Sequence, residues 1–334
     1  KTADDFDKPL LMIVGVRLGE DNWHWHHYEY VFGEMIRMSV PFEIDSNSVT
    51  AGGRKTPKMI FFNKQDRPKP ALFSELQKFK TVNIHIGNAV CYLSGDLCIF
   101  AVNYGRDVNI YDAKVLENMV VQSQFLHSLA AQITEVEDAF GYMVRALARA
   151  AEAIDEDSGN HVVRIGEYCA VLSERLGMGK EFTAAIKLQA TLHDVGKIYT
   201  PVSILRKKDK LTKEELLEIK KHPVFGAKII GAHPRLRLAQ SIALNHHELW
   251  DGSGYPRGLK GEAIPIEARI ANLADQYDTL RIPRAHKPAL DHDTTCRILN
   301  HGEGRILPQH FDPRLLWAFR ETSFLFEEIF RSNQ

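Results

Sequence analysis

Histidines and carboxylates suited to binding metal ions gather in the second half of the chain. Ten of the fifteen histidines lie after residue 160, and several stand beside acidic residues where helices should end or bend. Neutral imidazoles and carboxylates, with no cysteine among them, indicate a site for Fe, Mn, Zn, Ni or Co rather than a zinc site built from cysteine thiolates. Each histidine taken singly is more often structural, but the joint pattern predicts a metal centre.

The first candidate segment lies where a predicted helix ends. His193 and Asp194 follow the apolar helical stretch 182–192 and precede Lys197. A histidine, a carboxylate and an amine therefore project from one helix end. An adjacent His-Asp pair alone means little, and a lysine at a helix end is usually a solvated charge, so this segment depends on the others for its interpretation.

Two further histidine segments also stand at predicted helix ends. His222 precedes Pro223, which biases it away from helical geometry and marks a break between two helices. His246 and His247 end the helical run 238–245. Because adjacent residues on a helix point about 100° apart, both rings can bind one centre only if they reach it from its edge.

Two acidic residues and one more histidine complete the candidate set. Asp275 lies in the largely apolar segment 268–280, where an unpaired carboxylate would be costly to bury and a metal ion would neutralise it. His161 adds another nitrogen. Asp157 stands one helical turn before His161 if the helix extends that far, and it is otherwise an exposed acid in an acidic run.

In its motif order the chain resembles the HD-GYP phosphodiesterases of bacterial cyclic-dinucleotide signalling. The resemblance covers about half of the chain and is carried by segments 193–197 (HDVGK), 210–212, 222–223, 246–256 (HHELWDGSGYP), 258–261, 264–265, 268–270 and Asp275. A bare His-Asp pair would indicate only the broad HD hydrolases. The long glycine-tyrosine-proline segment separates this branch from the rest.

The resemblance implies an all-α HD-type metal hydrolase domain over residues 145–325 and two or three divalent ions per chain. One ion would be bound by His161, His193, Asp194 and Asp275, and its neighbour by Asp194, His222, His246 and His247. Asp194 would bridge the two. Some family members bind a third ion through an acidic residue four positions before the first histidine, where this chain has Asp157. Fe and Mn are the favoured ions, with Ni, Co and Zn as alternatives.

The resemblance also implies the substrate and its contacts. Family members hydrolyse cyclic di-GMP to pGpG, and some continue to GMP. Lys197 would contact a phosphate and assist the leaving oxygen, Tyr255 would lie beside a guanine base or ribose, and Arg284 and Lys287 would bind phosphate. Because Ala285-His286 replaces the family's Pro-Tyr pair, a preference for cyclic GMP-AMP stays open, as does a sensor that binds without hydrolysis.

The first part of the chain has a different pattern. Short apolar runs alternate with turn-forming stretches between residues 10 and 110, which predicts a small mixed α/β domain over residues 1–111. Its layout resembles a GAF-like or PAS-like sensor. The aromatic and histidine cluster 23–27 (WHWHH) is either a ligand or metal pocket or a partly buried aromatic segment.

A long helix is predicted between these two parts. Residues 112–152 contain no proline and one glycine. Apolar positions recur in steps of three and four, with one polar interruption at Gln122, at Met119, Leu126, Leu129, Ile133, Val136, Phe140, Met143, Leu147 and Ala150. This heptad spacing predicts a parallel coiled coil with a second copy of the chain. The alternative is an amphipathic helix lying on its own domain.

Composition limits the class of protein. The chain of 334 residues is 44% hydrophobic, enough for substantial cores, and is predicted to be α+β overall. Its 42 basic and 43 acidic residues nearly balance, which argues against an overall positive electrostatic field that would attract DNA. No apolar run is long enough for membrane insertion. Four scattered cysteines without a CxxC pair favour reduced thiols and a cytoplasmic location. The chain begins at Lys1, so the question of whether a further segment precedes it stays open.

Overall fold

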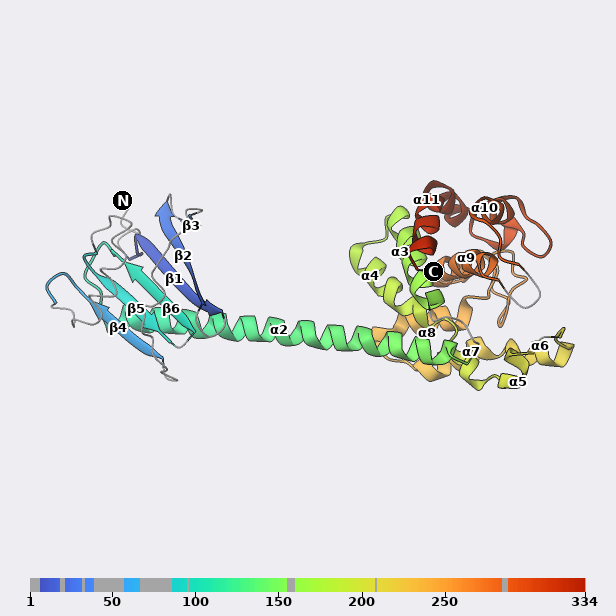
Figure 1. The fold of residues 1–334 in the computed structure, drawn as a ribbon, viewed down its shortest axis with the longest axis horizontal. Coiled ribbons are helices and arrows are strands. Elements are labelled where there is room, and N and C mark those ends of the chain that lie inside the picture. The colour runs from blue at the N-terminus through green and yellow to red at the C-terminus, as the bar shows by residue number, and fades with distance from the viewer. Residues whose placement is uncertain are drawn as a thin grey trace. The chain divides into compact units, whose positions relative to one another are not determined.

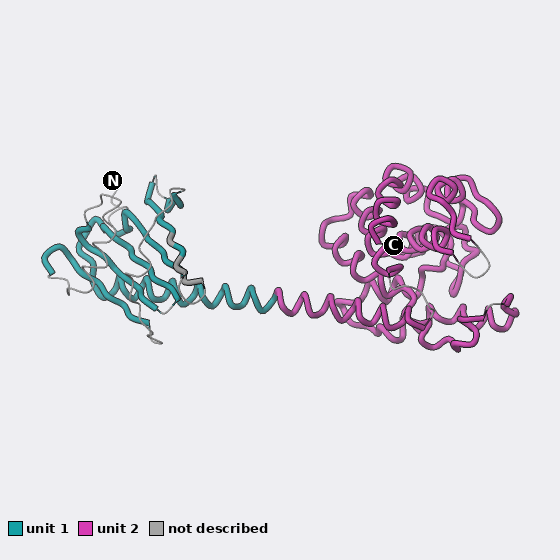
Figure 2. Tube along the Cα trace, viewed as in Figure 1, with its two compact units in different colours: residues 1–133 teal, residues 134–334 magenta. Residues whose placement is uncertain are grey.

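The computed structural model divides the chain into two compact units, residues 1–133 and 134–334 (Figure 2). It describes residues 7–18, 22–31, 34–38, 57–66, 86–94, 96–154, 160–207, 209–283 and 288–333. Three of the predicted site residues, Asp157, Arg284 and Lys287, lie outside the described residues. The predictions made for them therefore stay predictions.

The first unit contains a six-stranded antiparallel sheet (Figure 1). Its order across the sheet is β3-β2-β1-β6-β5-β4. The strands are β1 (Leu11–Leu18), β2 (Asn22–Val31), β3 (Glu34–Arg37), β4 (Lys58–Phe62), β5 (Ala89–Leu93) and β6 (Leu97–Val102). The alternating side chains of β5 supply both faces of the sheet, so that Cys91 packs in one core and Tyr92 in the other. Among the described residues of this unit, helix enters only as the first part of α2.

The predicted histidine cluster of the first unit lies on β2. His27 is buried, and His26 Nδ1 lies 2.8 Å from Arg37 Nη2 on the neighbouring strand β3. Within the described ranges, both residue groups that could bind a metal ion are in the second unit. The described residues of β2 thus contribute no group of metal-binding side chains, and the choice between a ligand pocket and a partly buried aromatic segment stays a prediction.

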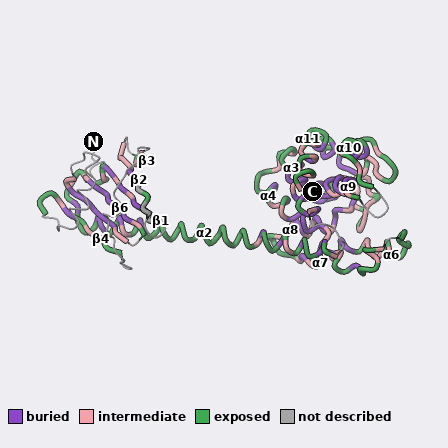
Figure 3. Tube along the Cα trace, in the orientation of Figure 1, coloured by how far each residue is buried: buried purple, intermediate pink, exposed green. Residues whose placement is uncertain are grey.

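One continuous helix, α2 (Ile110–Glu152), covers the range of the predicted long helix. Leu116 and Val120 near its start pack on the sheet of the first unit. Val144 and Ala148 near its end belong to a core of the second unit. The turns between these two cores are exposed (Figure 3).

The regular secondary structure described in the second unit is helical, apart from one isolated β-bridge between Glu303 and Ile306, as expected for the HD-type domain. Its α-helices are α3 (Asn160–Arg175), α4 (Lys180–Gln189), α5 (Val202–Leu205), α6 (Lys213–Ile219), α7 (His222–Ile230), α8 (Arg237–Asn245), α9 (Ile266–Arg281), α10 (His292–His301) and α11 (Pro313–Ser332). Short 3₁₀ turns join them: η4 (Ala190–Leu192), η5 (Val195–Tyr199), η6 (Pro234–Leu236), η7 (Gly261–Ala263) and η8 (Pro308–His310). No described helix is both long and apolar enough to cross a membrane.

Local sequence signals account for several helix boundaries. Thr212 and Glu215 form a capping box, in which Thr212 Oγ1 accepts from the Glu215 amide and Glu215 Oε2 accepts from the Thr212 amide. The predicted break at His222-Pro223 is confirmed, because α6 ends at Ile219 and α7 begins at His222. These boundaries bring a histidine to the start of a helix.

The main core of the second unit is aromatic and lies where α3, α9 and α11 meet. Tyr168 of α3 stacks on Phe326 of α11 with ring centroids 4.5 Å apart, and Tyr277 of α9 packs edge-on against both rings. Ile270 and Leu273 of α9 are fully buried in the same cluster, so the largely apolar segment 268–280 contributes to this core. This packing holds α9, the helix that carries Asp275, against α3, the helix that carries His161.

Candidate metal centre

Seven of the predicted ligands come together in the second unit. They lie mostly at helix ends: His161 in the first turn of α3, His193 after η4, Asp194 before η5, His222 at the start of α7, His246 and His247 after α8, and Asp275 within α9. The resulting cluster forms two groups that share one residue.

The first group surrounds the Nε2 atom of His161. His193 Nε2 lies 3.4 Å from it and Asp275 Oδ1 lies 3.7 Å from it. His193 Nε2 is in turn 3.3 Å from Asp194 Oδ2 and 4.0 Å from Asp275 Oδ1. Donors bound to one ion at about 2.0 to 2.2 Å lie within such distances of one another.

The second group surrounds the other oxygen of Asp194. Asp194 Oδ1 lies 3.1 Å from His222 Nε2 and 3.5 Å from His246 Nε2, and these two nitrogens are 3.3 Å apart. A ligand atom of His247 is within 4.8 Å of the same set. The two oxygens of Asp194 thus face different groups, as a bridging carboxylate requires.

Helix carbonyls orient three of the imidazole rings. His193 Nδ1 lies 3.0 Å from the carbonyl oxygen of Ala190, His222 Nδ1 lies 2.8 Å from that of Ile219, and His246 Nδ1 lies 3.1 Å from that of Ile242. A carbonyl oxygen only accepts, so in each case Nδ1 carries the proton. Where Nε2 carries no second proton, its lone pair points into the cluster, which is the form that binds metal.

The electrostatics of the site suit cations. Burial lowers the pKa of His246, and burial with neighbouring imidazoles lowers the pKa of His247 well below its usual value, so both are neutral at pH 7. Burial acts to raise the pKa of Asp194, but the charges of Lys197 and His193 outweigh it and lower that pKa well below its usual value. The neutral rings of His246 and His247 beside the ionised Asp194 fit a divalent ion of the Fe, Mn or Zn type. Burial acts to lower the pKa of His193, but the charge of Asp194 outweighs it and raises that pKa to about 9, so an ion bound there would replace a proton on this ring.

The glycine-tyrosine-proline loop folds back onto a ligand. A Cβ atom at Gly254 would lie 2.3 Å from the backbone nitrogen of Leu249 and 2.5 Å from the carbonyl oxygen of His247, so only glycine permits this approach. The next residue, Tyr255, donates its amide to the His247 carbonyl oxygen over 3.1 Å and stacks its ring on the His247 ring, with centroids 4.7 Å apart. Tyr255 therefore orients His247 in this structure.

Sequence reasoning missed the carboxylate that holds the loop. Glu248 is buried, and its two oxygens accept the amides of Arg257 and Leu259 over 2.7 and 2.8 Å. A carboxylate that accepts two backbone amides fixes the residues that donate them relative to its own segment. Glu248 thereby restrains the loop that carries Tyr255. Its place directly after His247 was visible in the sequence, but its partners were not.

A buried network that was also missed orients His161. Asp278 is fully buried, and its Oδ2 lies 2.7 Å from His161 Nδ1 while its Oδ1 accepts from Arg164 Nε over 2.7 Å. Burial acts to raise the pKa of Asp278, but hydrogen bonds from Arg164 and His161 outweigh it and lower that pKa. Asp278 stands one turn after Asp275 in the same apolar segment, so the argument that selected Asp275 could have found it.

Replacing Asp278 with asparagine is expected to weaken metal binding at the His161 end by about 10- to 100-fold, the usual effect of losing a partner that orients a ligand. The substitution keeps the side-chain volume but removes the charge that holds the His161 ring. Titration of metal-free protein with Mn²⁺ measures the effect. Asp293→Asn, which changes an exposed acid on α10, is the matched control. Equal Mn²⁺ affinities in the two variants would contradict the role assigned to Asp278.

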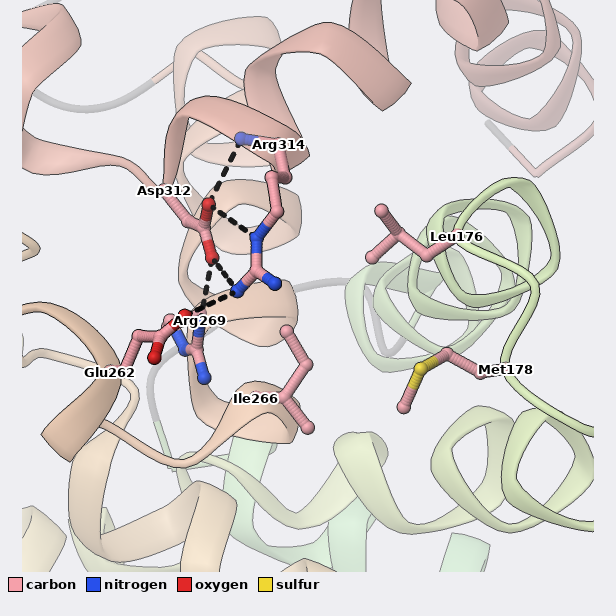
Figure 4. Close-up of a pocket in the computed structure, with 7 residues that line it drawn as sticks. All are labelled: Leu176, Met178, Glu262, Ile266, Arg269, Asp312 and Arg314. Atoms are coloured by element: carbon pink, nitrogen blue, oxygen red, sulfur yellow. Dashed lines mark hydrogen bonds and ion pairs between the residues drawn. The ribbon is translucent and has the colours of Figure 1, made fainter.

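A separate hollow of about 460 Å³ lies elsewhere in the second unit (Figure 4). It is lined by Leu176, Met178, Glu262, Ile266, Arg269, Asp312 and Arg314. Asp312 accepts hydrogen bonds from Arg269 over 2.6 Å and from Arg314 over 3.1 Å, so the charges of this hollow are paired with one another. None of the candidate metal ligands lines it.

Known proteins match the same part of the chain. A family model described as HD domain matches residues 116–315 of the 334. The chain is 39% identical over 226 residues to a cyclic di-GMP phosphodiesterase of Vibrio cholerae serotype O1, covering 63% of this chain and 45% of that protein. It is 39% identical over 203 residues to the cyclic di-GMP phosphodiesterase response regulator RpfG of Xanthomonas campestris pv. campestris, covering 60% and 53%.

A third relative is named for a different substrate. The 3'3'-cGAMP-specific phosphodiesterase 2 of Vibrio cholerae serotype O1 is 33% identical over 220 residues, covering 65% of this chain and 41% of that protein. The chain spans about half the length of these relatives. Because the family model covers more than half of the chain and includes both the His-Asp pair and the glycine-tyrosine-proline loop, the chain belongs to the HD domain family, in its HD-GYP branch.

Proposed function

We propose that this chain is a metal-dependent phosphodiesterase that hydrolyses cyclic di-GMP to the linear dinucleotide pGpG, with GMP as a further product. The observation that carries the proposal is the pair of ligand groups joined at Asp194. Divalent ions held by these two groups would lower the pKa of a bound water and would neutralise phosphodiester oxygens as charge develops. Relatives named as cyclic di-GMP phosphodiesterases support this substrate.

The chain's own residues have distinct parts in this reaction. Asp194 is the bridging ligand. Lys197 Nζ lies 2.8 Å from Asp194 Oδ2 and its side chain is 21% exposed, so an amine stands at the edge of the centre where a phosphate would arrive. From there it can bind the phosphate and give a proton to the leaving oxygen. Tyr255 is half-buried on His247 and presents its remaining edge to a base or ribose.

The number and identity of the ions are part of the proposal. The two ligand groups support two ions, and the mixed imidazole and carboxylate set favours Fe or Mn, with Ni, Co and Zn as alternatives. A third ion at Asp157 and phosphate contacts from Arg284 and Lys287 stay predictions. Anaerobic purification followed by elemental analysis measures the number of ions per chain.

Product chromatography tests the proposed reaction. Metal-loaded protein incubated with cyclic di-GMP should give pGpG or GMP, and prior removal of metal with a chelator should abolish both products. Intact cyclic di-GMP bound to fully metal-loaded protein would instead support a non-hydrolysing sensor. The same assay with cyclic GMP-AMP tests the alternative substrate, which the relative specific for 3'3'-cGAMP makes relevant. Higher kcat/KM for cyclic GMP-AMP would overturn the choice of cyclic di-GMP.

We also propose that two copies of the chain pair through α2 as a parallel coiled coil. Most of the apolar residues at heptad spacing are exposed, including Leu126, Ile133, Val136 and Met143, whose exposed fractions lie between 54% and 62%. An exposed apolar stripe repeating every 3.5 residues along a helix is the pattern of a coiled-coil seam. Residues 1–111 would then be a sensor-like domain and residues 112–152 the linker that joins it to the phosphodiesterase domain.

Replacing Ile133 with lysine is expected to weaken dimerisation at least about tenfold, because the seam would have to bury an unpaired charge. Sedimentation equilibrium of the full chain measures the effect. Val121→Lys is the matched control, since Val121 is equally exposed at 55% but lies off the heptad positions. If the two variants dimerise equally well, α2 is not the dimer interface.

A further inference from the structure

The last residue of α2 is a buried carboxylate. Glu152 is 6% exposed, whereas the side chain of Glu137 on the same helix is 55% exposed. Burying a charged carboxylate is costly unless a cation lies near it. The burial of the Glu152 carboxylate must therefore be explained by the groups around it.

Glu152 faces the first ligand group of the metal centre. Its Oε1 lies 4.0 Å from His161 Nε2, the nitrogen that is also 3.7 Å from Asp275 Oδ1 and 3.4 Å from His193 Nε2. Two donors of one ion, each at about 2.0 to 2.2 Å, are separated by at most about 4.4 Å. The carboxylate of Glu152 is thus within the range of a ligand to the ion that His161 would bind.

The packing of α2 holds this carboxylate in place. Ala148 and Ala151 of its last turns share a core with Val162, Leu192 and Val195. These three residues are the direct sequence neighbours of His161, His193 and Asp194. The end of α2, which carries Glu152, therefore packs against the same short segments that present three of the candidate ligands.

A simple ion pair with His161 is the competing explanation. The other nitrogen of that ring, Nδ1, is already within 2.7 Å of Asp278, whose ionised carboxylate requires a proton there. The separation of 4.0 Å between Glu152 Oε1 and His161 Nε2 is longer than a hydrogen bond, so contact with this ring alone does not account for the burial of Glu152. An ion held at Nε2 would be a cation that Glu152 faces.

We propose that Glu152 is a further ligand of the ion bound by His161, His193, Asp194 and Asp275, so that the linker helix itself contributes a donor to the metal centre. The inference rests on the proposed metal centre and adds a carboxylate that lies nine positions before His161, outside the motifs. Binding of that ion then also holds the last turn of α2 in place.

Titration of the metal-stripped full chain with Mn²⁺ tests the assignment. Glu152→Gln keeps the shape and removes the charge, and it is expected to weaken one Mn²⁺ site at least about 10- to 100-fold while the other is unchanged, the size of effect known for groups that support a metal site. Glu137→Gln, an exposed acid of the same helix, should bind as wild type. Hydrogen exchange should show Mn²⁺-dependent protection of residues 148–152 in wild type and its loss in Glu152→Gln.

The outcomes separate this inference from the proposed centre. Wild-type Mn²⁺ affinities and stoichiometry in folded Glu152→Gln would overturn the role of Glu152 and leave the centre intact. Absence of Mn²⁺ binding by the wild-type chain would overturn both. If circular dichroism shows that Glu152→Gln does not fold, Glu152→Asp is titrated instead. Its carboxylate is one methylene shorter, and an unchanged Mn²⁺ affinity would overturn the assignment.

Discussion

Replacing Asp194 with alanine is expected to reduce hydrolysis of cyclic di-GMP by at least about 10³-fold, the scale seen when a group that stabilises transition-state charge is removed. Asp194 is the one residue shared by both ligand groups, with Oδ2 3.3 Å from His193 and Oδ1 3.1 Å from His222. Its loss would remove a donor from each of the two proposed ions, and also the carboxylate that lies 2.8 Å from Lys197 Nζ. No neighbouring carboxylate in the described structure faces both groups.

The measurement is product formation at saturating metal, followed by elemental analysis of the same samples. Asp194→Asn provides a second variant of the same shape without the charge. Asp293→Ala, on the exposed face of α10, should retain full activity and metal content. If Asp194→Ala kept wild-type turnover with two bound ions, the bridging role and the mechanism built on it would both be wrong.

Replacing Gly196 with alanine is expected to destabilise the second unit by about 3 kcal/mol or more, the upper range for forcing an added methyl group into a packed interior. A Cβ atom there would lie 1.9 Å from the carbonyl oxygen of His222 and 2.4 Å from the backbone nitrogen of Gly226. Backbone atoms cannot rotate away as a side chain can. For a unit of this size the midpoint of thermal unfolding should fall by about 6 to 12 °C.

The same substitution should weaken metal binding, because it pushes η5 away from α7 and so separates Asp194 from His222. Thermal denaturation followed by Mn²⁺ titration measures both effects. Gly179→Ala is the control, since a Cβ atom at Gly179 meets nothing within 4 Å and its φ of −52° suits any residue. A Gly196→Ala protein as stable as the control would contradict the close approach of η5 and α7.

Several candidate ligands could be located from the sequence because they lie at local landmarks, whereas their grouping into two ligand sets was implied by the resemblance to the HD-GYP family. His193 and Asp194 follow an apolar helical run, His222 precedes a proline, and the adjacent pair His246-His247 ends a helix. Periodicity, capping boxes and helix breaks depend on neighbours within a few residues, so a sequence carries them directly. The α-helical character of the second unit and the bounds of α2 followed from the same local patterns.

The partners of these ligands could not be predicted, because contacts between distant segments do not follow from local patterns. Asp278 meets His161 across 117 positions, Tyr255 stacks on His247 rather than standing free in its loop, and Glu152 reaches the centre from the end of a helix predicted only as a linker. The sequence by itself determined which side chains could bind metal and on which elements they lie. Only the tertiary structure decided which carboxylates orient or join them, since that depends on how α2, α3 and α9 pack.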